Sequence, residues 1–324
     1  MPGIKSEVVP VFHCQRRPSA PNFRAVKPTV ALIVNTFNQA DYLSRVLQAV
    51  AHQQEPPDEV ILADDGSAEE TRLIFRQWAV NQPFAAQHVW HEKEGFRRSR
   101  ILNAAIAESR SDYLVFLDGD TIPHPWFVGD HRAQARRGFY IQGHRVLVTE
   151  RASAAFGKGN FSSDRSRAFF AGQLLGLKHI FRWPVPFRRI VPNLDGVRGC
   201  NLSAWRSDLA GINGYNEDYI GWGCEDLDLA LRLMNSGIRR LDVRGRALCY
   251  HLWHPLLDRS HLAANQQILD HTAVEKRKSC ERGLNLHLNN RCSDVWVQTN
   301  PVAQHENVRT AAAVVPVGAG ELSR

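Results

Sequence analysis

From Pro28 onward, two hydrophobic periodicities alternate along the chain, and this alternation constrains the fold more than any other feature. Short, continuously apolar runs occupy residues 29–34, 59–63, 87–90 and 113–117, as is typical of strands that are buried on both faces. Between them, apolar residues recur at helical spacing at 43–50, 68–80 and 101–107. Buried strands that alternate with helices predict an α/β fold, with a mostly parallel sheet covered by helices on both faces.

Beyond residue 138 the alternation is less regular. Residues 139–148 are predicted to be a strand, 199–205 resemble a strand, 225–237 form a helix that ends at Gly237, and 261–282 form another helix. The tail beyond Asn300 is rich in Ala, Val and Gly and is predicted to be disordered. The expected segments are therefore an N-terminal extension (1–27), a first half (28–150), an insert (151–192), a second half (193–258), a C-terminal helical region (259–299) and a tail (300–324).

The positive charge of the chain is concentrated in two segments. The hydrophobic fraction of 44% and the charged fraction of 23% are ordinary for a folded soluble chain. Residues 1–27 and 151–192 together carry more positive charge than the formal net charge of +7, so the remainder is acidic. This distribution argues against a nucleic-acid-binding surface and favours a basic edge that faces an anionic partner, although ordinary solvated charge explains it equally well.

The cysteines and the apolar runs indicate a cytoplasmic protein. The six cysteines form no C-x-x-C pair, which argues against a zinc knuckle or a disulfide framework and fits a reducing compartment. The first 27 residues lack the apolar run of a signal peptide, and no window reaches the ~18 apolar residues of a membrane-spanning helix. Residues 167–183 combine an apolar face with Arg, Lys and Trp. They are interpreted either as a buried core helix or as an interfacial helix on the anionic inner face of the cytoplasmic membrane.

Polar residues follow three of the predicted strands. Asn35 to Asn38 follow the first, Asp64 and Asp65 the second, and Asp118 and Asp120 the strand at 113–117. Each cluster alone would be explained by a solvated turn. Ligands of open parallel sheets bind beyond the carboxyl ends of the strands, however, so three clusters at one edge favour a binding site.

The sequence Asp-Gly-Asp at 118–120 places two carboxylates next to a buried strand. Two like charges so close together are costly unless a cation neutralises them. Mg²⁺ and Mn²⁺ prefer oxygen ligands and often keep coordination positions open for substrate phosphates. The pair therefore predicts a site for a divalent metal and a diphosphate.

A second acidic pair lies in the segment GWGCEDLDLALRL at 221–233. Glu225 and Asp226 begin a predicted helix, where favourable interaction with the helix dipole is one sufficient explanation. Trp222 stands between Gly221 and Gly223, which allows a ring and the backbone to approach a ligand closely. An acid beside an aromatic platform for a sugar is suited to deprotonate an acceptor hydroxyl as a general base.

Histidines and arginines supply further candidates. His251 and His254 are most simply structural, but neutral imidazole is also a ligand for Mn²⁺, and His251 is the candidate third ligand. Arg97, Arg98 and Arg100 precede a predicted helix and are interpreted either as a clamp for a diphosphate or as solvated charge.

These motifs, in this order, resemble the family 2 glycosyltransferases of the GT-A fold over residues 28–255. The resemblance implies a Rossmann-like central sheet whose first half binds a nucleotide sugar. It implies that Asn35 and Phe37 contact the nucleotide, with Phe37 against uracil, and that Asp65 reads the uracil edge. Arg97 would lie near the diphosphate, Asp120 would bind the metal directly, and Asp118 would act through the ribose or the water shell of the metal.

The second half, residues 193–258, is similar to the galactosyltransferase-type domain of chondroitin-polymerase-like and β-1,4-galactosyltransferase-like enzymes. There a Gly-Trp-Gly-x-Glu-Asp motif binds the acceptor sugar and supplies the base. The resemblance implies that Asp226 is the base with Glu225 beside it, that Trp222, Gly223 and Glu225 bind the acceptor, and that His251 rather than His254 completes the metal site. Cys224 departs from the pattern, because the resemblance implies a small residue such as glycine there.

The expected protein is thus an inverting glycosyltransferase that depends on Mn²⁺ or Mg²⁺. It would move a sugar from a nucleotide sugar, in the first place a UDP-sugar, to a hydroxyl of a glycan or glycolipid in bacterial lipopolysaccharide, capsule or other surface-polysaccharide synthesis. Two alternatives belong to other classes. A sugar-nucleotide nucleotidyltransferase would need a Gly-rich triphosphate loop, which the segment NTFNQADYL at 35–43 lacks. A catalytically silent subunit of a polysaccharide-assembly complex would not need Asp120, Asp226 and His251 together.

Overall fold

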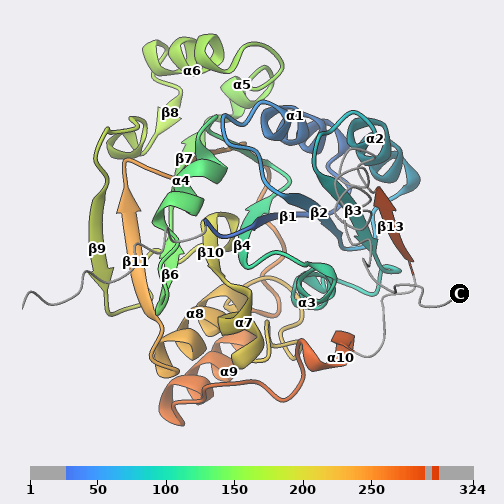
Figure 1. The fold of residues 1–324 in the computed structure, drawn as a ribbon, viewed down its shortest axis with the longest axis vertical. Helices are drawn as coiled ribbons and strands as arrows, with labels where there is room; N and C mark the ends of the chain where they lie inside the picture. Colours follow the sequence, from blue (N-terminus) through green and yellow to red (C-terminus); the bar gives the residue numbers. More distant parts are fainter. Residues whose placement is uncertain (1–26, 289–293, 299–324) are drawn as a thin grey trace, which may run out of the picture.

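The computed structural model describes residues 27–288 and 294–298. In this part of the chain the strands form a central sheet of nine, in the order β13-β3-β2-β1-β4-β10-β6-β11-β9 (Figure 1). Its strands are β1 (Val30–Thr36), β2 (Glu59–Asp64), β3 (Ala85–Trp90), β4 (Tyr113–Asp118), β6 (Phe139–Gln142), β9 (Phe187–Val191), β10 (Leu202–Trp205), β11 (Arg239–Arg244) and β13 (Asp294–Gln298). Strands β3, β2, β1 and β4 are parallel, whereas β10, β9 and β13 run antiparallel to their neighbours.

Helices cover both faces of this sheet, as the alternation predicts. Along β1, Val30, Leu32 and Val34 face one core, and Ala31 and Ile33 face the other. The first core contains helices α1 (Ala40–Ala51), α2 (Glu69–Ala79) and α4 (Phe127–Gln134), and the second contains α3 (Arg98–Glu108), α7 (Arg206–Gly211) and α8 (Glu225–Asn235). Figure 1 shows α1 and α2 on one side of the strands and α3, α7 and α8 on the other. Strands with two apolar faces need this double cover, because either bare face would expose a core surface to water.

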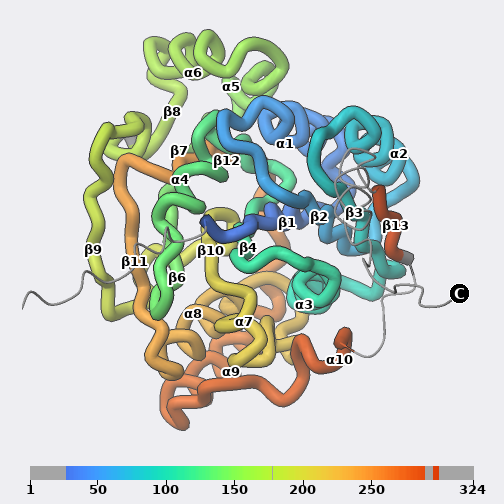
Figure 2. The backbone as a smooth tube through the Cα atoms, viewed as in Figure 1, coloured from blue at the N-terminus to red at the C-terminus, as the bar shows by residue number. Residues whose placement is uncertain are grey.

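A small second sheet brings two distant parts of the chain together. Its order is β5-β12-β7-β8, with β5 at Thr121–Pro123, β7 at His144–Val148, β8 at Leu174–Leu175 and β12 at Leu248–His251. Figure 2 shows β12 beside β7. In the antiparallel pair of β5 and β12, Thr121 is opposite His251, and Leu252 N–H donates to the carbonyl of Asp120 at 2.9 Å. This sheet therefore fixes the turn after β4 next to His251.

The prediction of one strand over residues 139–148 is wrong, because the chain passes from one sheet to the other at Gly143. Strand β6 ends at Gln142 in the central sheet, and β7 begins at His144 in the small one. A Cβ atom at Gly143 would lie 2.2 Å from Oδ1 of Asn201, so only glycine fits at this crossing.

The prediction of one helix over residues 167–183 is also wrong. Helix α6 (Phe161–Phe170) follows the short α5 (Glu150–Ser153), and a short 3-10 helix, η1 (Leu177–His179), follows β8. Gly172 and Gly176 adopt φ values of +65° and +84°, in the left-handed region that ends a helix. Phe170, Phe181 and Trp183 are exposed, so the segment is not a core helix. No helix in the described ranges is long and apolar enough to span a bilayer.

The carboxyl-terminal elements are partly as predicted. Helix α8 ends at Asn235, and Gly237, at φ +86°, terminates it as expected. Helix α9 (Leu262–Val274) is shorter than the predicted 261–282, and the region expected to be helical also contains strand β13, which pairs with β3. A short helix, α10, covers Asn285–Leu288. The predictions for residues 1–26 and for the tail at 300–324 lie outside the described residues.

The cysteines within the described ranges are unpaired, as the absence of a C-x-x-C motif predicts. They are Cys200, Cys224, Cys249 and Cys280. Cys14 and Cys292 lie outside these ranges.

Candidate active site

The three polar clusters predicted from the sequence meet at one edge of the central sheet. The parallel register places Asn35 of β1 beside Asp118 of β4 and beside Ala63 of β2, two residues before Asp65. Glu225 and Asp226, at the start of α8, are joined to the same edge by their ion pairs with Arg98 of α3. The sheet topology thus brings together distant residues such as Arg98 and Asp226, which lie 128 positions apart in the sequence.

The Asp118-Gly119-Asp120 turn aims its two carboxylates in different directions. Gly119 N–H donates to the carbonyl of Asn35 at 2.7 Å, and a Cβ atom at Gly119 would lie 2.9 Å from Oγ1 of Thr36. The close approach to β1 therefore requires glycine. Asp118 turns toward Arg98, at 3.2 Å, and Asp120 turns toward His251 and His254.

Asp120, His251 and His254 form the group that could hold a metal ion. One ligand atom from each lies within 4.8 Å of the others. Asp120 Oδ1 is 3.8 Å from Nε2 of His251, and Oδ2 is 3.4 Å from Nε2 of His254. The structure thus brings both histidines to Asp120, whereas the sequence interpretation preferred His251.

The orientations of both histidines suit metal binding. His254 Nδ1 lies 2.7 Å from the carbonyl of Pro255. Since a carbonyl only accepts, Nδ1 donates this hydrogen bond, and Nε2, on the side of Asp120, is the atom that could bind a metal. Burial lowers the pKa of His251 to about 4, so this ring is neutral at neutral pH. One carboxylate with two imidazoles is a donor set that fits Mn²⁺.

Arg98, one of the three arginines that precede the predicted helix, occupies the centre of the site. Its side chain is only 7% exposed and forms ion pairs with Asp118 at 3.2 Å, Glu225 at 3.2 Å and Asp226 at 2.7 Å. A buried carboxylate requires such a partner, because an unpaired buried charge is strongly destabilising. Arg98 therefore links the end of β4 to the start of α8.

Arg97, the predicted diphosphate-binding residue, is paired with Glu94. Its Nε donates to the carbonyl of Glu94 at 2.8 Å, and its guanidinium lies 3.4 Å from the carboxylate of Glu94. Helical phase does not distinguish the two arginines, because Arg97 and Arg98 precede the buried Ile101 by four and three residues. In the structure Arg98 is the first residue of α3 and is buried, whereas Arg97 directly precedes the helix.

Asp226 combines access to solvent with a fixed orientation. Its side chain is 21% exposed, Oδ1 accepts from Arg98, and Oδ2 accepts from the N–H of Gly199 at 2.9 Å. A Cβ atom at residue 199 would lie 2.2 Å from Oδ1 of Asp226. Gly199 is thus a site residue that sequence reasoning missed, since nothing local marks it as a partner of a carboxylate 27 residues later.

Glu225, next to Asp226, is in a different electrostatic environment. It is buried, and it accepts from Arg98 and from the N–H of Gly223. Burial, with the nearby negative charge of Asp226 as the second cause, raises the pKa of Glu225 to about 7. The adjacent acids are therefore unequal, because Asp226 reaches solvent and Glu225 does not.

The glycine-rich turn before α8 has an unusual backbone. Gly221, Gly223 and Cys224 have φ values of +73°, +112° and +72°, all in or near the left-handed region. Among these three residues Cys224 alone carries a Cβ atom, which makes the left-handed conformation less favourable there than at the two glycines. Arg259 lies over the ring of Trp222, 5.0 Å from its centroid.

The predicted nucleotide end of the site lies beyond β1 and β2. The carboxylate of Asp65 is buried and accepts from His91 and Lys93, each at 2.7 Å, and from Arg97 N–H at 3.2 Å. Phe37 is 39% exposed, with Nζ of Lys93 3.6 Å from the ring centroid. Among the described residues, Oδ1 of Asn35 is buried and has no hydrogen-bond partner. An exposed ring at Phe37 and this unpaired acceptor two residues earlier leave this end able to bind a polar aromatic group.

Two families match consecutive parts of the chain. Residues 31–171 match glycosyl transferase family 2, and residues 188–255 match the family described as the N-terminal domain of galactosyltransferase. The first match contains Asp65, Arg98, Asp118 and Asp120, and the second contains the segment from Gly199 to His254.

Several curated proteins are related over most of this chain. Validoxylamine A glucosyltransferase of Streptomyces hygroscopicus subsp. limoneus is 24% identical over 233 residues, which cover 65% of this chain and 49% of that protein. Hyaluronan synthase of Pasteurella multocida is 26% identical over 250 residues, or 68% and 24% of the two chains. Chondroitin synthase of Escherichia coli is 23% identical over 242 residues, or 68% and 34%. The chain thus matches half or less of the length of each of these relatives.

Two solved structures share the fold. Mannosyltransferase PcManGT from Pyrobaculum calidifontis, in complex with GDP-Man and Mn²⁺, has a TM-score of 0.51 and 19% identity, covering 90% of this chain and 77% of that one. TarS of S. aureus has a TM-score of 0.54 and 14% identity, covering 81% and 43%. These neighbours and the mostly parallel, helix-covered sheet establish the GT-A glycosyltransferase fold that the resemblance implied. Residues 31–171 of this chain match glycosyl transferase family 2, and they are followed by a segment that matches the galactosyltransferase-type family.

Proposed function

We propose that this protein is an inverting, metal-dependent glycosyltransferase that moves a sugar from a nucleotide sugar to a hydroxyl of a glycan or glycolipid. One observation carries the proposal. A metal-binding group, formed by Asp120, His251 and His254, and a partly exposed carboxylate, Asp226, lie at one sheet edge. The Asp118–Arg98 ion pair connects the two. A transferase of this kind needs both parts, one for the leaving group and one for the acceptor.

The donor would bind with its base at the β1–β2 end and its diphosphate near Asp120. Phe37 offers an exposed ring for the base, and the unpaired oxygen of Asn35 offers an acceptor. A UDP-sugar is the first donor to test, because Asp65 matches the position that reads uracil in the family. To bind Asp65, the edge of the nucleotide base would have to replace one of the groups that now donate a hydrogen bond to this carboxylate. Lys93 is the donor most easily displaced, because its side chain is long and flexible.

The metal, Mn²⁺ or Mg²⁺, would be held by Asp120, His251 and His254. When bound, it would neutralise the charge that develops on the departing diphosphate. Asp118 would assist without direct coordination, since its carboxylate is already paired with Arg98. Arg98 itself acts as a positioning residue for Asp226 and Glu225.

Asp226 would act as the general base. As the acceptor oxygen forms its bond to the anomeric carbon, its proton passes to an oxygen of Asp226 and the bond from that carbon to the diphosphate oxygen breaks. A single displacement of this kind inverts the configuration at the anomeric carbon. A carboxylate that accepts from Arg98 and from Gly199 N–H retains lone pairs for this proton and is held in one orientation.

The acceptor would be a surface glycan of the lipopolysaccharide or capsule type, bound beside Trp222 and Gly223. Hyaluronan synthase and chondroitin synthase are among the relatives. The exposed apolar side chains of the insert, among them Phe170, Val185 and Phe187, lie near basic residues. We infer that this surface rests on the anionic cytoplasmic face of a membrane, near a lipid-linked acceptor.

The test of the proposed chemistry is the substitution Asp226→Asn. Transfer to an acceptor should fall by two or more orders of magnitude, because the amide cannot take the proton, while the nucleotide sugar and Mn²⁺ bind as before. The matched control is Asp218→Asn, at an exposed residue paired with Arg282 at 3.5 Å, and it should transfer normally. Normal turnover by the Asp226→Asn variant would remove Asp226 from the mechanism.

A further inference from the structure

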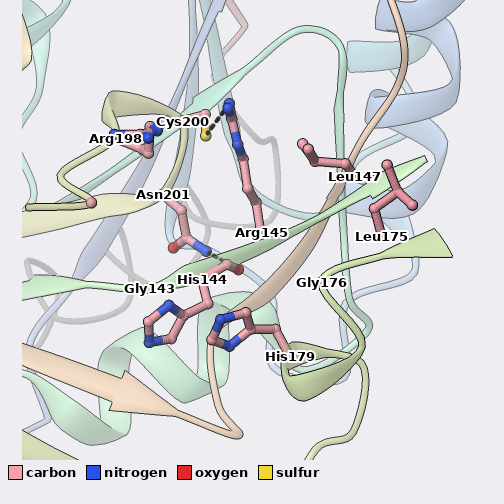
Figure 3. A pocket seen from close by; sticks show the side chains of 11 residues that line it. Gly143, His144, Arg145, Leu147, Leu175, Gly176, His179, Arg198, Cys200 and Asn201 are labelled. Carbon is pink, nitrogen blue, oxygen red and sulfur yellow. Dashed lines mark hydrogen bonds between the residues drawn. The ribbon is translucent and has the colours of Figure 1, made fainter. Parts of the chain in front are cut away.

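The structure contains a pocket of about 250 Å³, which Figure 3 shows with the side chains that line it. Pockets that hold drug-sized ligands are larger, at roughly 300–1,000 Å³, so this pocket suits about one sugar residue. It lies between β7, the end of β8 with the turn that follows it, and the loop before β10. Its lining residues are Gly143, His144, Arg145, Leu147, Leu175, Gly176, His179, Gly196, Arg198, Cys200 and Asn201.

Two arginines give this pocket a positive charge. Arg145 donates to Sγ of Cys200 at 3.7 Å, and Arg198 donates to the carbonyl of Val197 at 2.6 Å. In the described part of the chain, neither guanidinium is paired with a carboxylate at ion-pair distance, and none of the residues that line the pocket is acidic. The charge of both side chains is therefore available to a ligand.

The histidines form an uncharged wall of the same pocket. The rings of His144 and His179 stack with their centroids 4.0 Å apart and their planes within 11° (Figure 3). Burial, reinforced by the positive charges of Arg244 and Lys178, lowers the pKa of each ring to about 4. The rings are neutral at neutral pH, so they add no charge of their own to the pocket.

The position of the pocket relative to the candidate active site indicates which substrate it serves. Arg198 directly precedes Gly199, whose N–H orients Asp226, and Arg145 is close enough to Asp118 for their charges to interact. In the central sheet β4 lies between β1, on the nucleotide side, and β10, on the pocket side. The pocket is thus on the side of Asp118 and Asp226 that faces away from the proposed nucleotide end.

We propose that this pocket binds an anionic group, a carboxylate or a phosphate, carried by the acceptor sugar, with Arg145 and Arg198 as its partners. Guanidinium groups suit both anions because they donate two parallel hydrogen bonds to a pair of oxygens. The assignment to the acceptor rests on the proposed function, since it takes Asp226 as the base. Leu147 and Leu175, which are exposed at the pocket, would contact the less polar part of the same molecule.

The test compares probes that differ in their charge. Binding of 4-nitrophenyl β-glucuronide and 4-nitrophenyl β-glucoside is measured by calorimetry in the presence of UDP and Mn²⁺, and glucose 6-phosphate is compared with glucose in the same way. At least one anionic probe should bind roughly tenfold or more tightly than its neutral counterpart. The carboxylate and phosphate arms then distinguish the two sources of negative charge.

The variant Arg198→Gln should abolish this preference and leave the binding of the neutral probes unchanged. Arg198 is exposed, so its substitution should not prevent folding. Arg189→Gln, at an exposed arginine of β9 outside the pocket, is the matched control and should keep the preference. Equal affinity for anionic and neutral probes, or a preference that survives in Arg198→Gln, would overturn the inference.

Donor binding separates this inference from the proposed function. UDP-glucose and UDP-glucuronic acid are titrated into the wild type and into Arg198→Gln with Mn²⁺ present. Both proteins should bind both donors alike if the pocket serves the acceptor. An effect of Arg198→Gln on the choice between the donors would assign the pocket to the donor sugar and overturn the inference. Failure of every nucleotide sugar to bind would instead count against the proposed function, whatever the glycosides do.

Discussion

At the scale of single residues, the main feature of the candidate site is that one arginine faces several negatively charged side chains. Arg98 faces three carboxylates, those of Asp118, Glu225 and Asp226, in a largely buried position. One guanidinium cannot neutralise three negative charges, so part of the imbalance must be relieved by protonation or by a bound cation. The raised pKa of Glu225, to about 7, is one such relief.

The pKa of Glu225 gives the folded protein a specific pH dependence. The pKa is raised from an ordinary value of 4.5 to about 7, so between these values the folded state holds a proton that the unfolded state has lost. Stability therefore falls as the pH rises through this window. The variant Glu225→Gln has no carboxyl group to titrate at this position. The free energy of unfolding of the variant minus that of the wild type should therefore increase by ~3 kcal/mol from pH 4 to pH 8.

Urea unfolding of the metal-free proteins across this pH range measures the difference. The comparison cancels the contribution of other titrating groups that the substitution does not disturb. A difference between the two proteins that stays constant from pH 4 to pH 8 would show that Glu225 titrates as an ordinary carboxylate.

Gly199 offers a second test at this scale. In the variant Gly199→Ala, the new methyl group would lie 2.2 Å from Oδ1 of Asp226, so the carboxylate must move and transfer should fall at least tenfold. Gly211→Ala is the matched control, because a Cβ atom there meets nothing within 4 Å. Transfer rates of both variants, with circular dichroism to confirm folding, decide the question. Full activity in Gly199→Ala would contradict the role given to its N–H.

The sequence could predict some of these residues and not others, for a physical reason. Asp118, Asp120, Glu225 and Asp226 belong to local motifs, and the spacing of each motif carries its chemistry. The contact between Arg98 and Asp226 joins residues 128 positions apart, and no local pattern encodes such a distance. The charge of the arginine cluster does not by itself distinguish Arg97 from Arg98, because the direction in which each side chain leaves the helix decides which one reaches the site.

At the scale of elements, helix α8 is fixed by a buried ion pair. Nε of Arg232 lies 2.8 Å from the carboxylate of Asp228, and Nη1 of the same side chain donates to the carbonyls of Ile212 and Gly214 at 2.7 and 2.8 Å. Thr272 of α9 donates to the other oxygen of Asp228 at 2.8 Å. These bonds join α8 to the preceding loop and to α9, and so they support the orientation of Glu225 and Asp226.

Removal of one partner from this pair should be costly. The variant Arg232→Met leaves the charge of Asp228 buried and unpaired, and the free energy of unfolding should fall by ~3–5 kcal/mol. The double variant Arg232→Met with Asp228→Asn removes that charge and should recover part of the loss. Chemical denaturation of the three proteins gives both values. A double variant no more stable than the single one would show that the loss comes from the carbonyl contacts of Arg232 alone.

Helices and strands were predicted correctly where an apolar run is compatible with one structure, and incorrectly where it is compatible with two. The strands at 29–34, 59–63 and 113–117 are buried on both faces, and their apolar runs are accordingly unambiguous. The run at 139–148 is equally apolar, but it crosses between two sheets at Gly143, where the side chain of Asn201 approaches. The apolar side chains of 167–183 looked helical, yet several of them are exposed around two turns with glycine in the left-handed region.

At the scale of the whole molecule, the proposed site exists only because two sheets meet. The small sheet brings His251 to Asp120 through β5 and β12, and the central sheet brings Asp118 to α8 through Arg98. Neither half of the chain contains both the proposed metal-binding group and the proposed base. This dependence on the complete fold is consistent with the two family matches, which each cover only one part.

The surface of the insert is the basis of a prediction for the whole molecule. Phe170, Val185 and Phe187 are 86%, 74% and 64% exposed, and the arginines at 188 and 189 are exposed beside them in the sequence. The protein should sediment with vesicles that contain anionic lipid and much less with neutral ones, and added salt should weaken the binding. The triple variant Phe170→Ser, Val185→Ser and Phe187→Ser should no longer sediment with the anionic vesicles.

Leu73→Ser is the control for that experiment, because Leu73 is an exposed apolar residue of α2, outside the insert. It should leave vesicle binding unchanged. Equal binding to anionic and neutral vesicles, or unchanged binding by the triple serine variant, would remove the membrane from the proposed function.

The central claim is that a metal and a nucleotide sugar bind together at the edge formed by Asp120, His251 and His254. Thermal unfolding with a panel of nucleotide sugars, with and without Mn²⁺, tests it most directly, because a ligand that binds only the folded state raises Tm. At least one nucleotide sugar at saturating concentration should raise Tm by roughly 5 °C or more with Mn²⁺ present, and much less without it. The shift should be lost in the variant His251→Ala combined with His254→Ala. No shift that depends on Mn²⁺ with any nucleotide sugar, or an equal shift in that double variant, would contradict the account.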